Sequence, residues 1–339
     1  MAARVPINFT GPMSFWKHNP CVPTWAGTAH AWWTNAPPRL LEPTPPPPGA
    51  TSVPGLAMTR GLGPAPAPAA VEVAHFWNLW FSASHQARSD IPSAVVAAAI
   101  TAGRWDIWIV RRTTGTQEIV GTVVRRWIHG LTIGMARWPR AGVVDFFVVH
   151  PAVRGKGVGR WLLNALQAGT PRPVPPHLLL WEGVGTVPPL AWGQLWSYQR
   201  PGPGPGPGPS PGPGPEATVK KCVDPSTQSS HWGSLTRTTF LHSAWDPVTT
   251  ELSLWQTPAG IVAVQDLYHR SVPEGRRMAM IVAATTPAAV AAFAAASPWS
   301  LLLADRAWDA HWVRDSPFQW VGYNVLAGTV TTSYPCIGL

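Results

Sequence analysis

The chain has 339 residues, of which 45% are hydrophobic, enough for one large or two average domains, and this excludes a wholly disordered chain. Its net charge of +9 is scattered as single residues and pairs without a Lys/Arg block, so we expect no nucleic-acid partner. Its three cysteines, Cys21, Cys222 and Cys336, lie far apart without metal-ligand spacing. We therefore expect no metal site and a reducing, cytoplasmic location.

The first part of the chain predicts a Pro-rich arm over residues 1–70 and then a folded block over residues 71–200. In that block, alternating polar and apolar residues predict strands, and apolar residues at helical spacing predict helices. The predicted strands are 105–110, 119–127, 143–149 and 177–181, and the predicted helices are 71–87, 92–102 and 158–168.

A linker over residues 201–216 separates this block from a second one over residues 217–339. Its Gly-Pro alternation forms neither helix nor sheet and predicts a solvated spacer. The uncharged stretch 278–304 is long enough on paper to span a bilayer. However, Thr286 and Pro287 predict a helix start inside it, so we expect a β-α-β unit and no transmembrane segment. The predicted elements are a hairpin of 252–256 and 261–265, strands at 278–282, 299–303 and 320–326, and a helix at 288–296.

A glycine-rich turn joins the strand ending at Val149 to the helix beginning at Val158. Glycines let the backbone approach a ligand closely, and a helix N-terminus with nearby cations attracts anions. The turn therefore predicts a pyrophosphate-binding site, whereas its spacing excludes both a GxGxxG dinucleotide fingerprint and a P-loop. The residues of this turn are Arg154, Gly155, Lys156, Gly157 and Gly159.

The Arg-x-x-Gly-x-Gly pattern of residues 154–159 resembles the coenzyme A pyrophosphate loop of the GNAT-type acyl-CoA transferases. Other segments resemble the glycylpeptide N-tetradecanoyltransferase (protein N-myristoyltransferase) family, of which the chain would be a divergent member. Residues 15–23 resemble the family's Phe-Trp-x-x-x-Pro-Val-Pro segment with one extra residue, Cys21. Residues 146–150 resemble its Phe-Leu-Cys-Val-His strand, and residues 337–339 resemble its Val-Gly-Leu ending.

This resemblance implies an α/β (α+β) fold of two fused GNAT-like domains, each a mixed, mostly antiparallel twisted sheet flanked by helices. The implied reaction transfers a tetradecanoyl (myristoyl) group from acyl-CoA to the N-terminal glycine amine of a protein or peptide. Myristoyl-CoA would be a co-substrate, with no permanently bound cofactor. Residues 71–200 would bind acyl-CoA, residues 217–339 would bind the peptide, and we expect a monomer.

The resemblance also implies the site residues. The backbone N–H groups of Phe146 and Phe147 would hold the thioester oxygen, and the α-carboxylate of Leu339 would accept the amine proton. His150, just before Pro151 at a strand end, is interpreted as structural rather than as a base. The residues implied to contact the cofactor are Ser14, Phe15, Trp16, Phe146, Phe147, Val148, Arg154, Gly155, Lys156, Gly157, Val158 and Gly159.

Three features depart from the family and leave alternatives open. The family's acidic run after its first helix is absent, since residues 82–90 offer only Asp90. The turn is glycine-rich as in acetyltransferases, so the acyl-chain length is not set. The chain also ends sooner after Ile-Gly-Leu than family members do. The alternatives are a GNAT-type N-acetyltransferase acting on an amine, or a catalytically inactive acyl-CoA-binding protein with a structural or interaction role.

Overall fold

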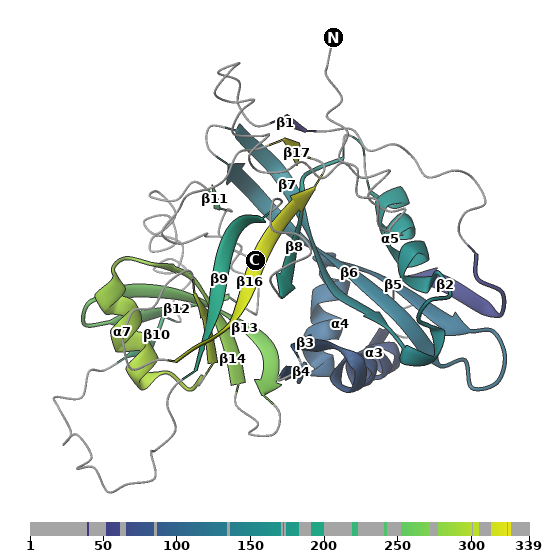
Figure 1. Cartoon of the computed structure of the whole chain (residues 1–339), viewed down its shortest axis with the longest axis horizontal. Coiled ribbons are helices and arrows are strands. Elements are labelled where there is room, and N and C mark those ends of the chain that lie inside the picture. The colour runs from purple at the N-terminus through teal and green to yellow at the C-terminus, as the bar shows by residue number, and fades with distance from the viewer. Residues whose placement is uncertain are drawn as a thin grey trace, which may run out of the picture.

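The structure is a long mixed β-sheet with helices packed on its faces (Figure 1). It is a computed structural model that describes residues 39–40, 52–61, 66–84, 87–133, 136–170, 172, 174–182, 191–199, 219–222, 241–242, 252–271, 277–299, 301–304, 313–323 and 325–326. The helices are α3 (Pro66–Trp80), α4 (Ser93–Thr101), the 3-10 turn η1 (Pro151–Val153), α5 (Val158–Ala168) and α7 (Pro287–Ala296). The strands are β1 (Arg39–Leu40), β2 (Leu56–Arg60), β3 (Ser82–Ser84), β4 (Ala87–Ser89), β5 (Trp105–Arg112), β6 (Ile119–Ile133), β7 (Ala136–Val149), β8 (His177–Glu182), β9 (Ala191–Gln199), β10 (Lys220–Lys221), β11 (Leu241–His242), β12 (Leu252–Thr257), β13 (Gly260–Ser271), β14 (Arg277–Ala284), β15 (Leu301–Ala304), β16 (Val313–Tyr323) and β17 (Val325–Leu326).

Twelve strands of the described part follow one path, β10-β12-β13-β14-β15-β9-β16-β8-β7-β6-β5-β2. Off this path, β11 pairs with β6 and β4 pairs with β3 and β13, while β1 and β17 form a separate two-stranded sheet. Strands β7 and β8 pair in parallel, as do β14 and β15, while the hairpins β5–β6 and β12–β13 are antiparallel. Each half therefore repeats the order hairpin, strand, helix, parallel strand. The predicted α/β (α+β) fold of two fused halves, each with a mixed and mostly antiparallel sheet, is confirmed.

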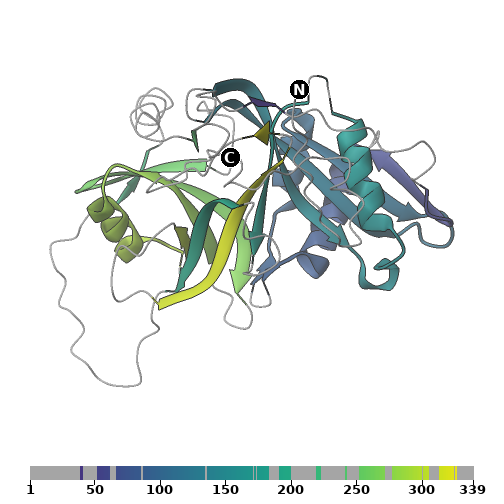
Figure 2. The same cartoon turned by 45° about the horizontal axis from the view of Figure 1, so that its top comes forward.

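Two strands join the halves into this continuous sheet. Strand β9 precedes the linker in sequence, yet it lies between β15 and β16 of the second half. Strand β16 in turn pairs with β8 of the first half. Figure 2 shows β9 and β16 running side by side at the centre of the molecule. The predicted domain limits stay a prediction, and the sheet itself crosses the predicted boundary at residue 200.

Helices cover both faces of the sheet in the first half. Successive side chains of a strand point to opposite faces, so alternate residues of β5 pack against different helices. Ile107 and Ile109 pack in the cluster that contains α3 and α4. Trp108 and Val110, which alternate with them, pack in the cluster under α5. In the second half, α7 packs on β13, β14 and β15 through a separate buried cluster. The glycine-rich turn thus leads into α5, which is fixed on the sheet by its own hydrophobic cluster.

The helix predicted at 71–87 begins earlier and ends earlier, because α3 spans Pro66–Trp80. Proline is tolerated in a first helical turn and alanine favours helix, so α3 begins within the predicted Pro-rich arm, in which Leu56–Arg60 also form β2. The helix ends at Trp80 because the following residues form β3 and β4, and β4 pairs with β13. Strand β9, which the sequence patterns do not predict, is the other main difference.

The uncharged stretch forms β14, α7 and β15, as predicted. Thr286 caps α7 by accepting a hydrogen bond from the N–H of Ala289 at 3.0 Å, and Pro287 occupies the first helical position. Among the described residues, every helix is too short or too polar to cross a membrane.

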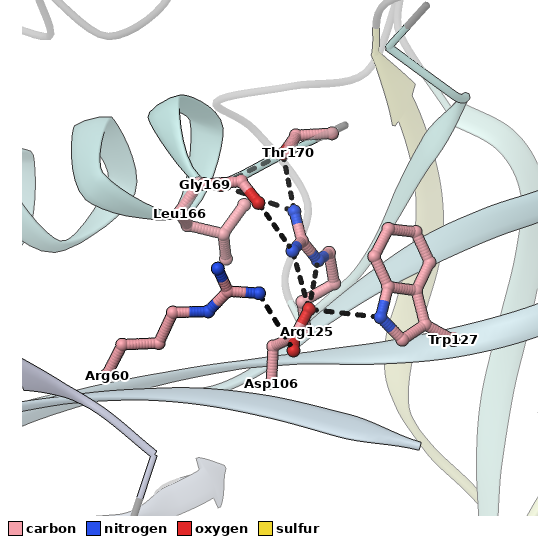
Figure 3. A network of polar contacts seen from close by, with 7 residues as sticks. All are labelled: Arg60, Asp106, Arg125, Trp127, Leu166, Gly169 and Thr170. Atoms are coloured by element: carbon pink, nitrogen blue, oxygen red, sulfur yellow. Dashed lines mark hydrogen bonds and ion pairs between the residues drawn. The ribbon is translucent and has the colours of Figure 1, made fainter. Parts of the chain in front are cut away.

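A fully buried arginine fixes the C-terminal end of α5. The Arg125 side chain, on β6, has no exposed surface and donates to the carbonyl oxygens of Leu166 (3.3 Å) and Gly169 (3.2 Å). It also donates to the hydroxyl of Thr170. The last carbonyls of a helix have no intrahelical donor, and the partial negative charge at this end of the helix dipole also stabilises a cation. Arg125 therefore ties the end of α5 to the sheet (Figure 3).

The charge of Arg125 is balanced by Asp106 on β5, whose Oδ2 atom lies 2.5 Å from Nη2 of the arginine. The same oxygen accepts the indole N–H of Trp127 at 3.0 Å, and Arg60 donates to Oδ1 at 3.2 Å. Burial alone would raise the pKa of Asp106, but the hydrogen bonds and charges of Arg125 and Arg60 outweigh it and hold that pKa below its ordinary 3.8. The network is thus an ionised, hydrogen-bonded pair (Figure 3).

We predict that Arg125→Ala lowers the free energy of unfolding by about 3–5 kcal/mol, because it leaves Asp106 without its main partner and the end of α5 without donors. Urea denaturation measures this loss. Arg60→Ala is the matched control, since Arg60 contacts the same carboxylate but its side chain is 54% exposed, and we expect a loss below about 1 kcal/mol. Equal losses in the two variants would contradict the structural role of Arg125.

Candidate functional site

A gap opens in the sheet where β7 and β8 part. The two strands pair from Gly142 and His177 to Val144 and Leu179, yet β7 continues to Val149 and β8 also runs on. Figure 1 shows β8 descending while β5 and β6 run toward the lower right. The last part of β7 therefore presents backbone N–H and C=O groups on an edge that β8 does not cover, and such groups readily bind a ligand.

His177 lies at the closed end of this gap. Its ring is fully buried, and its Nδ1 lies 2.9 Å from the carbonyl oxygen of Pro175. Burial, followed by the positive charge of Arg125, lowers the pKa of His177 from 6.5 to about 3. The imidazole is therefore neutral at physiological pH and serves as a packing element rather than a charge.

Strand β7 carries a β-bulge at its uncovered edge. Thr122 pairs with Val148 and Val124 with Asp145, so two residues of β7 stand opposite one residue of β6. Phe146, one of the two, has a φ of 43°, which is uncommon for a residue with a side chain. Bulges interrupt the strand ladder and redirect its backbone groups, and they recur beside active sites.

The contacts of Phe146 explain how this conformation is held. Its ring stacks on Trp77 at a centroid distance of 4.0 Å. Its carbonyl accepts the Thr122 hydroxyl at 3.1 Å, and that hydroxyl accepts the indole N–H of Trp77 at 2.8 Å. Its N–H donates to Oδ1 of Asp145 at 2.7 Å. Ring and backbone are both anchored, so the bulge is preformed without a ligand.

The next residue, Phe147, is 39% exposed and reaches the first turn of α5. A Cβ atom added to Gly159 would lie 3.0 Å from Cζ of the Phe147 ring, so a side chain at this position would make the ring shift by a few tenths of an ångström. The structure thus places Phe146 and Phe147 beside the glycine-rich turn. Their role as oxyanion donors stays a prediction, and it requires Asp145 to release the N–H of Phe146.

The turn itself has the backbone that its glycines permit. Gly155 has a φ of 77° and Gly157 a φ of 86°, both in the left-handed region that side chains disfavour. Gly157 is the N-cap of α5. The first N–H groups of a helix lack intrahelical acceptors and point outward along its axis, so this end of α5 is suited to bind an anion.

Two cations stand at this helix end. Arg154 donates from Nε to the carbonyl of Val149 at 3.0 Å, which holds its guanidinium near the end of β7, and Lys156 is exposed. His150 accepts the N–H of Ala152 through Nδ1 at 3.2 Å, in agreement with a structural histidine. Arg154, Lys156 and the glycines form one turn suited to bind an anion, which we call the cradle (residues 154–159).

The other residues implied by the resemblance divide into two groups. Val148 and Val158 are buried at 3% and 1% exposure, so their side chains form core and only their backbone faces the site. Ser14, Phe15, Trp16 and Leu339 lie outside the described residues, and their roles stay predictions. In the part of the chain that the structure describes, no three His, Cys, Asp or Glu side chains cluster to hold a metal ion.

Sequence patterns give no indication of the residues that support the bulge, because Trp77 and Thr122 each look like ordinary core positions. They also miss His269, which reaches this region from β13 of the second half. The His269 ring lies 5.3 Å from that of Phe81, edge to face, and Phe81 lies 5.1 Å from Phe146. Burial lowers the pKa of His269, so it too is held neutral.

The corresponding turn of the second half differs from the cradle. There Thr286 accepts the N–H of Ala289 and donates to the carbonyl of Ala259 at 3.1 Å. The start of α7 is therefore capped by its own side chain, and its turn brings neither glycine nor cation. Of these two equivalent turns, only the one before α5 is built to receive an anion.

Residues 71–168 match the family described as "Acetyltransferase (GNAT) family". No curated protein sequence matches the chain. Three crystal structures of Saccharomyces cerevisiae N-myristoyltransferase, all with bound myristoyl-CoA and one also with inhibitors, are similar in fold, with TM-scores of 0.60, 0.59 and 0.57. Their sequences are 12%, 10% and 11% identical to this chain. The matched regions cover 87%, 87% and 85% of this chain, and 87%, 85% and 86% of the yeast chains. The likeness shows the fold and covers both halves.

We predict that the free energy of unfolding falls as the pH is lowered from about 6.5 toward 3, at up to about 1.4 kcal/mol per pH unit. Above this range His177 is neutral in both states. Within it, the unfolded chain binds a proton that the folded chain, with its lowered pKa, does not. His177→Asn does not titrate and can still donate to Pro175. Urea denaturation over the pH range should give the variant a shallower slope. His269 contributes to the remainder, as does Asp106 at the acid end of the range, and equal slopes would contradict the assignment.

Proposed function

We propose that the protein transfers a tetradecanoyl group from acyl-CoA to the N-terminal glycine amine of a peptide or protein. The observation that carries the proposal is the extent of the fold likeness. It covers 87% of this chain and 87% of a yeast N-myristoyltransferase structure, whereas the GNAT match covers residues 71–168 only. A second half fused through shared strands supplies a surface for an acceptor larger than a small amine.

In this proposal the two described features of the first half act on one ligand. The cradle binds the pyrophosphate of acyl-CoA through α5, Arg154 and Lys156. The thioester lies at the bulge of β7, where backbone N–H groups stabilise the oxygen as it becomes negative. The amine nitrogen bonds to the thioester carbon, the C–S bond breaks, and coenzyme A leaves as the thiol after the amine has lost a proton.

An N-acetyltransferase is the second candidate, because the cradle contains Gly155, Gly157 and Gly159 and resembles the acetyl-CoA loop. The two candidates differ in the acyl chain that must be accommodated. Burying a chain of fourteen carbons adds roughly 0.8 kcal/mol per CH₂ group to binding, so a tetradecanoyl-specific site binds acetyl-CoA much more weakly.

We predict that the purified protein acylates a Gly-initiated peptide with tetradecanoyl-CoA and not with acetyl-CoA. Mass spectrometry of the peptide measures the transfer. The same peptide with an acetylated N-terminus is the control, since it has no free amine. Transfer from acetyl-CoA alone would replace the proposal with the second candidate. Binding of acyl-CoA without transfer to any amine would indicate an inactive acyl-CoA-binding protein.

We predict that Arg154→Ala and Lys156→Ala together weaken acyl-CoA binding, by roughly 1–3 kcal/mol for each charge-assisted hydrogen bond that the two substitutions remove. Isothermal titration calorimetry measures the dissociation constant. The control replaces Lys220 and Lys221 with Ala, because replacing these exposed lysines on β10 removes the same number of charges from the other half. Unchanged affinity in the cradle variant would mean that residues 154–159 are only a turn.

A further inference from the structure

A buried amide in the second half has no partner. The side chain of Gln265, on β13, is 1% exposed, and neither its oxygen nor its nitrogen has a hydrogen-bond partner. Its neighbours across the sheet are Leu252 on β12 and Met280 on β14, whose side chains offer no conventional donor or strong acceptor. An unpaired buried amide costs free energy, and native proteins contain few of them. Gln265 therefore lacks a polar partner that a ligand can supply.

Gln265 shares one face of the sheet with His269. Gln265 pairs with Met280 and His269 with Met278, because a bulge in β13 removes two residues from the register. Ala279, between these methionines, belongs to the core under α7. Gln265 and His269 thus lie on the face opposite α7, at neighbouring same-face positions about 7 Å apart along the partner strand.

This face of the second half borders the bulge of β7 in the first half. His269 contacts Phe81, and Phe81 contacts Phe146 at the bulge. The end of β13 also pairs directly with β4, with His269 opposite Ser89. From the bulge across the junction of the halves, the order of contacts is Phe146, Phe81 and His269, and Gln265 is the next residue on that face of β13.

We propose that Gln265 and His269 bind the backbone of the acceptor chain as it extends from the amine at the bulge. The inference rests on the proposed function and names the residues of the second half that hold its acceptor. A carboxamide with both its donor and its acceptor unpaired requires a partner that offers both, and a peptide group does so in one plane. A carboxylate or an ammonium group satisfies only one side.

The imidazole extends this complementarity. Nδ1 of His269 bonds to the carbonyl of Leu267, so that nitrogen carries the proton and Nε2 remains an acceptor. The pair then offers one amide N–H₂ group, with two donor hydrogens, and two acceptor atoms along a single face. A main-chain segment satisfies this pattern irrespective of its side chains, which fits an acceptor recognised mainly by its free N-terminus.

The test uses Gln265→Met, which keeps the length of the side chain and removes its hydrogen bonds. The full-length protein is loaded with a tetradecanoyl-CoA analogue that has a thioether in place of the thioester. Binding of a Gly-initiated octapeptide is then measured by calorimetry. We expect the dissociation constant for the peptide to rise about tenfold or more, with that for the CoA analogue unchanged. The melting temperature of the free protein should rise by about 2 °C or more, because an unpaired buried amide has been removed.

Gln167→Met is the matched control. Gln167, on α5, is 7% exposed and also has an unpaired amide oxygen, but it lies at the end of α5 away from the cradle. It should leave peptide affinity at the wild-type value. As a second probe, octapeptides with an ester in place of each of the first three backbone amides identify the contact. One of them should bind more weakly than the parent peptide to the wild type but not to Gln265→Met.

The outcomes are distinct. Wild-type peptide affinity in Gln265→Met, or equal losses in Gln265→Met and Gln167→Met, overturns the inference and leaves the proposed function standing. A wild-type protein that neither binds nor acylates a Gly-initiated peptide overturns both. If Gln265→Met loses CoA binding through misfolding, Gln265→Glu replaces it. Glu keeps the shape and the acceptor oxygen but has a second oxygen in place of the N–H₂ donor group, so the inference again requires weaker peptide binding, and unchanged affinity overturns it.

Discussion

The position of the cradle depends on one buried guanidinium. Helix α5 has eleven residues and spans roughly 16 Å. Its first turn adjoins the cradle, and its last turn is bound by Arg125. At the first turn, Gly159 lies against the ring of Phe147, so the helix is fixed at both ends to the same sheet. Asp106 makes burial of the cation tolerable by supplying the opposite charge and accepting the indole of Trp127. The geometry of cradle and bulge is thereby set before any ligand binds, which reduces the ordering that binding would otherwise require.

The bulge shows how a locally unfavourable backbone is made stable. A positive φ at Phe146 would relax if its neighbours allowed it, but stacking on Trp77 and the chain of hydrogen bonds through Thr122 leave no alternative position for the ring or the carbonyl. All three residues are buried, so the polar chain operates in a low dielectric where each bond is stronger. The second half adds His269, whose ring contacts Phe81 of the first half beside Phe146. Site geometry in the first half is therefore coupled to the packing of the second.

Local features of this protein could be predicted from the sequence and non-local ones could not. The cradle and the limits of α5 are predictable because glycine, proline and the amphipathic repeat act over a few residues, and α5 begins and ends as expected at residues 158 and 168. Arg125 looks in sequence like one of many scattered surface charges, since only the fold shows that β6 places it under the end of α5. Gln265 and His269 are four residues apart, so strand alternation puts them on one face. However, a bulge in β13 places them opposite residues of β14 that are only two apart, and the sequence does not show that bulge.

The shared strands have a consequence for how the chain reaches its native state. In β9, Gln199 pairs with Leu301 and Val313, both more than a hundred residues further along the chain. During synthesis, β9 emerges well before either partner, and the first half ends in a strand with two unpaired edges. Contacts between residues so far apart in the sequence form late, and they make folding slower. The chain therefore cannot complete its first half as an independent unit, and it should depend on chaperones, or on rapid arrival of the second half, to protect β9 from pairing with other chains.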